Sequence, residues 1–321
     1  MRKLPLLLAA LGASALVLAG CSASTPEPFA AGCDTLAVSD PSVTDLVTVK
    51  GEFGVAPKVT MYSPFVTEQT VHSVVEAGHG RVIDTPNQLV SLDMALYSGT
   101  TGAQLVTSVF GDANPAKPIA LSSWGETFEG LQRGLMCATE GSRVIVAMPS
   151  DDVAGGQGVG ALGIAPGESI VAVVDVRDVF RSKADGADQF VAGHGLPTVV
   201  RAADGQPGVT IPVGAPPSEF VARTLKLGDG DTVQAGDTVI VQYTGLTWNE
   251  RAVFDSSWSG PAREMSLDGV IPGFAQALEG QTVGSQVLAV IPPELGYGDQ
   301  GTPKIPANST LVFVVDILGI G

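Results

Sequence analysis

The fold is decided by residues 271–292, IPGFAQALEGQTVGSQVLAVIP, where a short helical pattern runs directly into a strand pattern. Phe274 and Leu278 are spaced i, i+4, a proline stands near the start of the segment, and Gly280 lies just past its end, which predicts one short helix. Residues 287–291 then alternate with period two, which predicts a strand with one face toward a core.

The same alternation occurs at residues 239–243 and 311–317, on either side of this segment in the sequence. Several strands with one short helix between them indicate an α+β domain. We therefore expect an antiparallel twisted β-sheet wrapped on one short α-helix.

The pattern also occurs earlier in the chain. Residues 128–149 align with 271–292 without a gap, and residues 169–176 align with 310–317. Chance similarity between β-rich sequences is the alternative, but the shared order of helix, strand, loop and last strand favours duplication. We expect two domains of one fold, at 37–180 and 219–321. Between them, residues 181–218 are expected to form a Gly/Pro-rich linker with one short strand pair.

Composition limits the classes of function. Of the 321 residues, 45% are hydrophobic and only 16% are charged, so the chain has ample material for cores. The formal net charge of −16 argues against a nucleic-acid interface, which needs a basic face. The G-x-G-x-x-G match at 158–163 is followed by Pro166-Gly167 and a strand pattern instead of a helix, and the three histidines lack metal-ligand spacing, so we expect no cofactor and no metal.

The first residues have the pattern of a targeting segment. Arg2 and Lys3 precede an apolar run, too short for a convincing membrane span, that ends in Leu18-Ala19-Gly20-Cys21. This ending resembles the lipobox of bacterial lipoproteins, in which the cysteine is lipidated; an ordinary signal peptide with a chance cysteine is the alternative. We expect a signal peptide at 1–20, a lipid anchor on Cys21, a tether at 21–36, and attachment to the outer face of the bacterial cell membrane.

Two cysteines remain, Cys33 and Cys137. Because disulfides persist outside the cytoplasm, we expect a bond between them that ties the tether to the first domain. Two buried thiols are the alternative.

Seven motifs follow one another in the second domain: Gly228-Asp229-Gly230, residues 241–245, Phe254-Asp255-Ser256-Ser257, residues 270–274, residues 291–298, Ile305-Pro306 and residues 310–313. Their order and spacing resemble those of the FKBP-type peptidyl-prolyl cis–trans isomerases. The whole chain is thus similar to a bacterial, actinobacterial-like lipoprotein with two FKBP-like domains.

The resemblance implies rotation about X–Pro bonds without a covalent step, against a barrier of about 18–20 kcal/mol. A dry aromatic cup favours the twisted amide, and donors hold the flanking carbonyls. The implied catalytic residues are Tyr243, Asp255 and Tyr297. The implied substrate-binding residues are Phe254, Val270, Ile271, Phe274, Ile305 and Phe313. The implied partners are proline-containing polypeptides that fold outside the cytoplasm, and macrolide ligands.

The sequence departs from the family pattern at three positions. Phe274 stands where the family often has tryptophan, Arg263 falls near a position that is usually aromatic, and Lys304 stands where an apolar residue is common. These residues make the expected groove rim more polar. They keep open an alternative function, a non-catalytic peptide-binding or chaperone lipoprotein.

The first domain lacks most of the implied site. Its corresponding residues are Met94 (with Tyr97 as an alternative), Leu105, Val106, Leu131, Ala154 and Ala172. Without the aromatic cup and the carboxylate, we expect this domain to be degenerate and catalytically silent.

Overall fold

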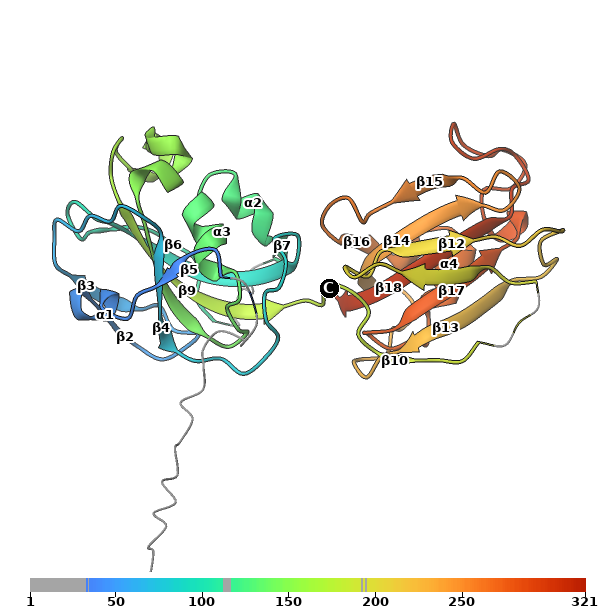
Figure 1. Ribbon diagram of the computed structural model, residues 1–321, viewed down its shortest axis with the longest axis horizontal. Coiled ribbons are helices and arrows are strands. Elements are labelled where there is room, and N and C mark those ends of the chain that lie inside the picture. Colours follow the sequence, from blue (N-terminus) through green and yellow to red (C-terminus); the bar gives the residue numbers. More distant parts are fainter. Residues whose placement is uncertain (1–32, 34, 112–116, 192, 194) are drawn as a thin grey trace, which may run out of the picture.

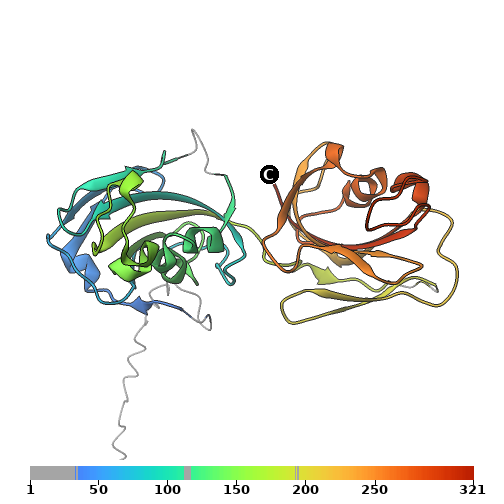
Figure 2. The same cartoon turned by 90° about the horizontal axis from the view of Figure 1, so that it is seen from above.

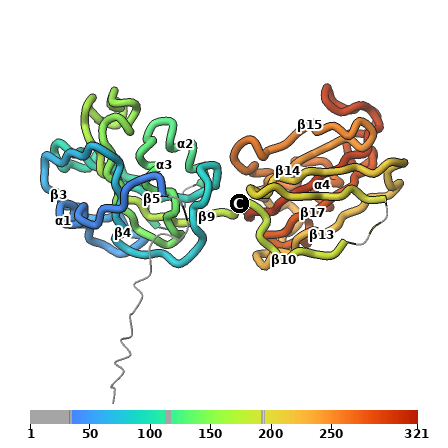
Figure 3. The backbone as a smooth tube through the Cα atoms, viewed as in Figure 1, coloured from blue at the N-terminus to red at the C-terminus, as the bar shows by residue number. Residues whose placement is uncertain are grey.

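The computed structural model describes residues 33, 35–111, 117–191, 193 and 195–321 (Figure 1). Two sheets of seven strands dominate it. The first unit, built on strands β1 to β9, lies beside the second unit, built on β10 to β18, and the backbone passes between them after β9 (Figure 3). The lipidation expected at Cys21 and most of the expected tether lie outside the described residues.

The elements of the first unit are β1 (Val38–Ser39), α1 (Val43–Leu46), β2 (Val47–Lys50), β3 (Lys58–Met61), β4 (Val71–Glu76), β5 (Leu89–Ser98), β6 (Gln104–Thr107), β7 (Ile119–Ala120), α2 (Leu121–Gly125), α3 (Glu129–Leu135), β8 (Arg143–Met148) and β9 (Ile170–Val179). Three 3₁₀ turns, Ser150–Asp152, Ala154–Gly156 and Gly160–Leu162, lie between β8 and β9.

The elements of the second unit are β10 (Ala187–Asp188), β11 (Thr198–Arg201), β12 (Pro207–Thr210), β13 (Val221–Leu227), β14 (Thr238–Thr247), β15 (Val253–Ser256), β16 (Arg263–Ser266), α4 (Pro272–Leu278), β17 (Gln286–Ile291) and β18 (Leu311–Ile320). Its 3₁₀ turns are Leu267–Gly269 and Pro293–Leu295.

Both sheets have the same strand order. The first runs β1-β4-β8-β9-β5-β6 with β7 paired to β5, and the second runs β10-β13-β17-β18-β14-β15 with β16 paired to β14. The expected α+β class is confirmed. The expectation of a wholly antiparallel sheet is wrong at one edge, because β1 pairs with β4 in parallel. Residues 40–70, which hold α1 and the β2–β3 hairpin, form a crossover long enough for a parallel pair.

One short helix per domain is also an underestimate for the first unit, which carries α1 and α2 besides α3. The single turn of α1 is favoured by local hydrogen bonds: Asp40 accepts the Ser42 N–H at 2.9 Å, and the Thr44 hydroxyl donates to the Pro41 carbonyl at 2.6 Å. In the second unit α4 begins at Pro272, a residue suited to the first helical position, and lies over one face of the sheet (Figure 2).

The strands of both sheets are buried on two faces, although their sequence predicts one buried face. All six residues of β8 and all six of β17 are buried. α3 or α4 covers one face, and a two-stranded hairpin, β2–β3 or β11–β12, packs its apolar residues over the other.

Residues 181–218 therefore do not form a free linker. Val199 and Val209 of the β11–β12 hairpin pack with Trp248, Leu288 and Val314 of the second unit. β10 extends the second sheet by pairing with β13. Much of this segment belongs structurally to the second unit.

The expected disulfide between Cys33 and Cys137 is present, with a Cα–Cα distance of 5.8 Å. Cys137 is fully buried just after α3, so the bond ties the beginning of the described chain to the first core. No helix in the described ranges is long and apolar enough to cross a membrane.

The two units meet in a small apolar cluster. Leu89 and Ala120 of the first unit pack with Ile240 and Leu318 of the second, and the half-buried Phe180 packs against them. The Gln88 side-chain amide donates to the Phe180 carbonyl at 2.7 Å. These contacts fix the start of the connection between the units.

Candidate active site

An aromatic cavity of about 490 Å³ opens between α4 and the end of the second sheet. Tyr243 of β14, Phe254 of β15, Phe274 of α4 and Phe313 of β18 line it. The ring centroids of Phe274 and Phe313 are 5.3 Å apart and those of Phe254 and Phe313 are 5.6 Å apart, both edge to face. This arrangement is the favourable one for aromatic rings and leaves a cup with apolar walls.

Two glycines allow these rings to meet. A Cβ on Gly245 of β14 would lie 2.6 Å from Phe254 and 2.8 Å from Phe313. A Cβ on Gly273 of α4 would lie 2.3 Å from Ile291, so α4 sits directly on β17. At both positions the neighbouring side chains lie too close for any residue larger than glycine. The close packing of α4 on β17 sets the depth at which Phe274 enters the cup.

A polar pair lies at one side of the cavity. The Tyr243 hydroxyl donates to Asp255 Oδ2 at 2.5 Å, and the Ser256 N–H donates to Asp255 Oδ1 at 3.0 Å. Burial raises the pKa of Tyr243 well above its ordinary value, and the hydrogen bond to Asp255 raises it further because a phenolate could not donate. The phenol therefore stays protonated and holds the carboxylate, which is itself exposed.

Two further groups at the cavity can donate. Ile271 is the N-cap residue of α4, where helical N–H groups lack intrahelical partners. Within the described residues, neither the Ile271 N–H nor the Tyr297 hydroxyl has a protein acceptor, and 39% of Tyr297 is exposed. Both residues line the cavity, so both donors are available to carbonyl groups of a ligand.

The structure brings together eight of the nine expected site residues: Tyr243, Phe254, Asp255, Val270, Ile271, Phe274, Tyr297 and Phe313. Ile305 does not line the cavity. It is 4% exposed and packs in the core behind it, where its N–H donates to the Thr302 carbonyl at 3.1 Å.

Three lining residues escaped the sequence reasoning: Met265, Gly269 and Pro272. The sequence gives no signal for Met265, because only the strand register places it opposite Val239 on β14, on the side of the sheet that carries the core. Arg263, opposite Val241, is exposed on the same strand. Lys304 borders a neighbouring hollow that shares Phe254 as a wall.

Residues 230–318 match the sequence model of the family described as FKBP-type peptidyl-prolyl cis-trans isomerase. The FK506-binding protein of Streptomyces anulatus is 37% identical over 120 residues, which cover 36% of this chain and 97% of that relative. This chain belongs to the FKBP family. The expected resemblance is confirmed for the second unit, whereas the first unit lies outside the matched residues.

Other FKBP relatives are longer than the matched segment. The FKBP-type peptidyl-prolyl cis-trans isomerase FkpA of Escherichia coli K12 is 43% identical over 102 residues, 32% of this chain and 37% of that relative. The chain thus spans little more than a third of that relative's length. The crystal structure of FkpA from Escherichia coli matches with a TM-score of 0.30 and 36% identity, over 38% of this chain and 51% of that chain.

The first unit lacks the FKBP cup at the equivalent place. Met94 lies opposite Val174 as Tyr243 lies opposite Val315, whereas Tyr97 packs on the other face of the sheet, so Met94 is the equivalent of Tyr243. Leu105, Leu131 and Ala172 join Met94 in one apolar cluster.

The donors of the FKBP site are also absent from the first unit. The Phe128 N–H, in the place of the Ile271 N–H, donates to the Trp124 carbonyl at 2.8 Å. Ala154, in the place of Tyr297, has no hydroxyl, and its N–H donates to the Thr127 carbonyl at 2.7 Å. Phe128 and Val153 form a β-bridge, so the loop after β8 is closed onto the segment before α3.

Proposed function

We propose that the second unit is a peptidyl-prolyl cis–trans isomerase acting on proline-containing polypeptides outside the cytoplasm. One observation carries this proposal: an apolar cup of four aromatic rings has the Tyr243–Asp255 pair and two unpaired donors at its edge. Family membership supports the same activity.

The cup binds the proline ring against Phe274 and Phe313. In this apolar surrounding the twisted amide, which has lost its resonance and charge separation, is favoured over the planar one. The Ile271 N–H and the Tyr297 hydroxyl hold the carbonyls that flank the rotating bond. Asp255, oriented by Tyr243, lies at the edge of the cup and polarises the amide region. No covalent bond forms or breaks.

The first unit is a degenerate FKBP-like domain without isomerase activity in this proposal. Its equal strand order supports the common fold, and its closed loop and apolar filling support the lack of activity. We assign it to spacing the second unit from the membrane or to holding client chains.

The location is also proposed. The Leu18-Ala19-Gly20-Cys21 sequence supports removal of a signal peptide and lipid attachment at Cys21, and the Cys33–Cys137 disulfide is consistent with an oxidising compartment. Several acyl chains on one cysteine would anchor the protein stably. Macrolides are proposed as ligands of the same cup.

The isomerase activity is tested by following cis-to-trans relaxation of a proline peptide with the purified full chain in detergent. Wild-type protein is expected to accelerate the relaxation, and Tyr297→Phe is expected to reduce the acceleration about tenfold by removing one donor. Equal relaxation with and without protein contradicts the proposal.

Non-catalytic peptide binding is the second candidate, favoured by the exposed Arg263 and by Lys304 near the groove. This function predicts that the protein suppresses aggregation of client chains while leaving the rate of proline-peptide relaxation unchanged. Suppression that disappears together with isomerase activity counts against it.

A further inference from the structure

A row of buried polar side chains crosses the second sheet on the face opposite α4. Gln242 of β14 is the direct cross-strand neighbour of Asp316 on β18, which in turn is opposite Gln286 on β17. None of the three is more than 6% exposed. Buried polar groups are costly unless hydrogen-bonded, so their partners identify what the row holds in place.

At one end of the row, Gln242 fastens the loop that follows β15. Its Nε2 donates to the Gly260 carbonyl at 3.1 Å, and its Oε1 accepts the Ser257 hydroxyl. Ser257 Oγ also accepts the Tyr243 N–H at 2.9 Å, and the Ser257 N–H donates to the Tyr243 carbonyl at 3.0 Å. Four hydrogen bonds thus join residues 257–260 to two neighbouring residues of β14.

This fastening lies directly behind the active site. Successive strand residues point to opposite faces, so Tyr243 enters the cup while Gln242 points away from it. Asp255 stands two residues before Ser257, in β15 opposite Gly245 of β14, and its carboxylate meets the Tyr243 hydroxyl at 2.5 Å. The β14–β15 pairing and the fastened residues that follow it therefore hold this pair together from both sides of Asp255.

We propose that Gln242 and Ser257 are positioning residues of the isomerase, which hold Asp255 against Tyr243 from outside the cup. The inference rests on the proposed function of the second unit. Neither residue lines the aromatic cavity, so neither touches the substrate.

The first unit keeps the same fastening without a catalytic pair. The Ser108 N–H donates to the Met94 carbonyl at 2.8 Å, and Ser108 Oγ accepts the Met94 N–H at 2.9 Å. At the position of Gln242 stands Asp93, which accepts the Gly111 N–H at 3.0 Å. Ser108 therefore provides a matched control, with the same backbone contacts and no aromatic cup.

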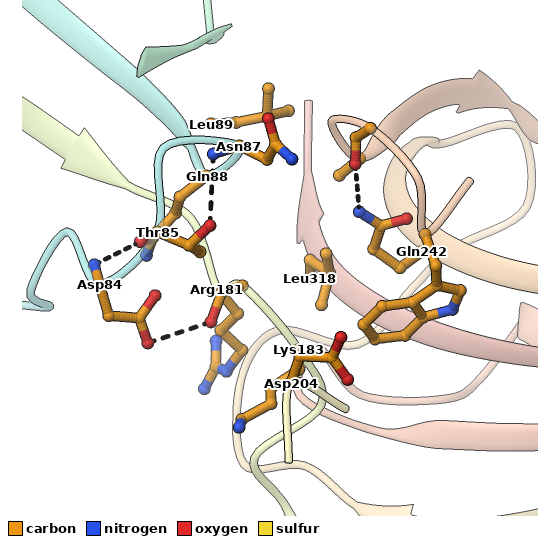
Figure 4. Close-up of a pocket in the computed structure, with 14 residues that line it drawn as sticks. Asp84, Thr85, Asn87, Gln88, Leu89, Arg181, Lys183, Asp204, Gln242 and Leu318 are labelled. Carbon is orange, nitrogen blue, oxygen red and sulfur yellow. Dashed lines mark hydrogen bonds between the residues drawn. The ribbon is translucent and has the colours of Figure 1, made fainter. Parts of the chain in front are cut away.

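The end of the row at Gln242 also faces the first unit. Gln242 and Leu318 line one side of a pocket of about 320 Å³, and Asp84 and Gln88 of the first unit line the other (Figure 4). Trp258 also lines this pocket. A Cβ on Gly205 would lie 3.0 Å from the Trp258 ring, so the turn between β11 and β12 supports the same loop. The β11–β12 turn, which lies outside the family match, thus supports the loop that follows the strand of Asp255.

Ser257→Ala is the first test. We expect kcat/KM to fall about tenfold, the rate equivalent of about one hydrogen bond, mainly through kcat. Ser108→Ala removes the equivalent contact in the first unit. It is expected to lower the melting temperature as much as Ser257→Ala does, while leaving kcat/KM unchanged. Equal kcat/KM values for wild type and folded Ser257→Ala overturn the inference.

Gln242→Glu is the second test, and it has a pH readout. A carboxylate cannot donate to the Gly260 carbonyl, whereas the protonated acid can, so activity is expected to be low at pH 8 and to recover toward pH 5. The charged groups around this position are Asp316 on β18, Asp255 on β15, and Asp84, Arg181, Lys183 and Asp204 in the pocket. A pH profile identical to that of the wild type contradicts the inference.

A spectroscopic measurement separates this inference from the proposed function. Ultraviolet titration of Tyr243, isolated as the difference from Tyr243→Phe, is expected to show ionisation at lower pH in Ser257→Ala, because Asp255 is released. An unchanged titration together with unchanged kcat/KM refutes the positioning role. Wild-type protein that leaves proline relaxation unaccelerated refutes the isomerase instead, whatever the titration shows.

Discussion

Asp316 is a carboxylate placed at the centre of an otherwise apolar sheet, and it makes stability depend on pH. It is 2% exposed and accepts hydrogen bonds from the Gln286 amide at 2.6 Å and the Ala184 N–H at 2.8 Å. Burial raises the pKa of Asp316 from 3.8 to about 6, although these hydrogen bonds and the charges of Arg201 and Lys226 lower it.

The sign of the effect follows from the raised pKa. The folded chain holds this proton more tightly than the unfolded chain, so its contribution to stability is complete below pH about 4 and is lost as the pH rises through about 6. At about 1.36 kcal/mol per pH unit, the interval between 3.8 and about 6 corresponds to a loss of about 3 kcal/mol. This loss applies to the second unit.

The assay is guanidinium unfolding at pH 4.5 and 7.5, followed by fluorescence of Trp248 and Trp258 in the second unit. Asp316→Asn cannot ionise and keeps an acceptor for the Ala184 N–H, so this part of the pH dependence should disappear. Asp299→Asn, in an exposed loop, is the matched control and should unfold with the wild-type pH dependence. If Asp316→Asn and wild type lose the same free energy between the two pH values, the reasoning is refuted.

Three other perturbations address the cup, the first unit and the tether. Gly245→Ala places a Cβ within 2.6 Å of Phe254 and is expected to lower kcat/KM at least tenfold in the proline-relaxation assay, and full activity would show that the rings yield. Arg143→Met breaks the fully buried pair with Asp175 and the bonds to the Gly51 and Val55 carbonyls, so unfolding free energy should fall by about 3–5 kcal/mol, and a loss below about 1 kcal/mol would contradict this. Reduction of Cys33–Cys137, which are 104 residues apart, should lower the stability of the first unit by up to about 5 kcal/mol, and a calorimetric scan that does not change on reduction would contradict this.

The shared pattern of helix and strands and the equivalence of the two units could be predicted from the sequence. The packing between distant segments could not. The alignment of residues 128–149 with 271–292 placed α3, α4, β8 and β17 correctly, because periodicity and turn residues are local signals. The same alignment identified Leu131 as the equivalent of Phe274, and its continuation toward the N-terminus gave Met94, with Tyr97 as the alternative, for Tyr243; the strand register supports Met94.

The β11–β12 hairpin shows why the rest was missed. Residues 181–218 are rich in glycine and proline and look like a linker, yet Val199 and Val209 cover the outer face of the second sheet. This burial depends on distant partners, such as the Arg201 Nε that donates to Gln286 Oε1 at 2.7 Å. The periodicity of residues within a short strand gives no information about a partner that lies far away in the sequence.

The sequence prediction of the cavity lining differs from the structure at two positions for the same reason. Ile305 belongs to a motif of the family but turns into the core, whereas Met265 enters the cup from an edge strand whose pairing with β14 is known only from the register. Residue type and spacing place a side chain near the site, and long-range packing decides whether it lines the cavity.

The most direct measurement is the acceleration of proline-peptide relaxation by two variants at equivalent positions, Asp255→Ala in the second unit and Val106→Ala in the first. If the second unit alone is the isomerase, Asp255→Ala should lose most of the acceleration, by about tenfold or more, while Val106→Ala keeps the wild-type rate. Full acceleration by Asp255→Ala, or a loss confined to Val106→Ala, would contradict the assignment of the activity to the Tyr243–Asp255 cup.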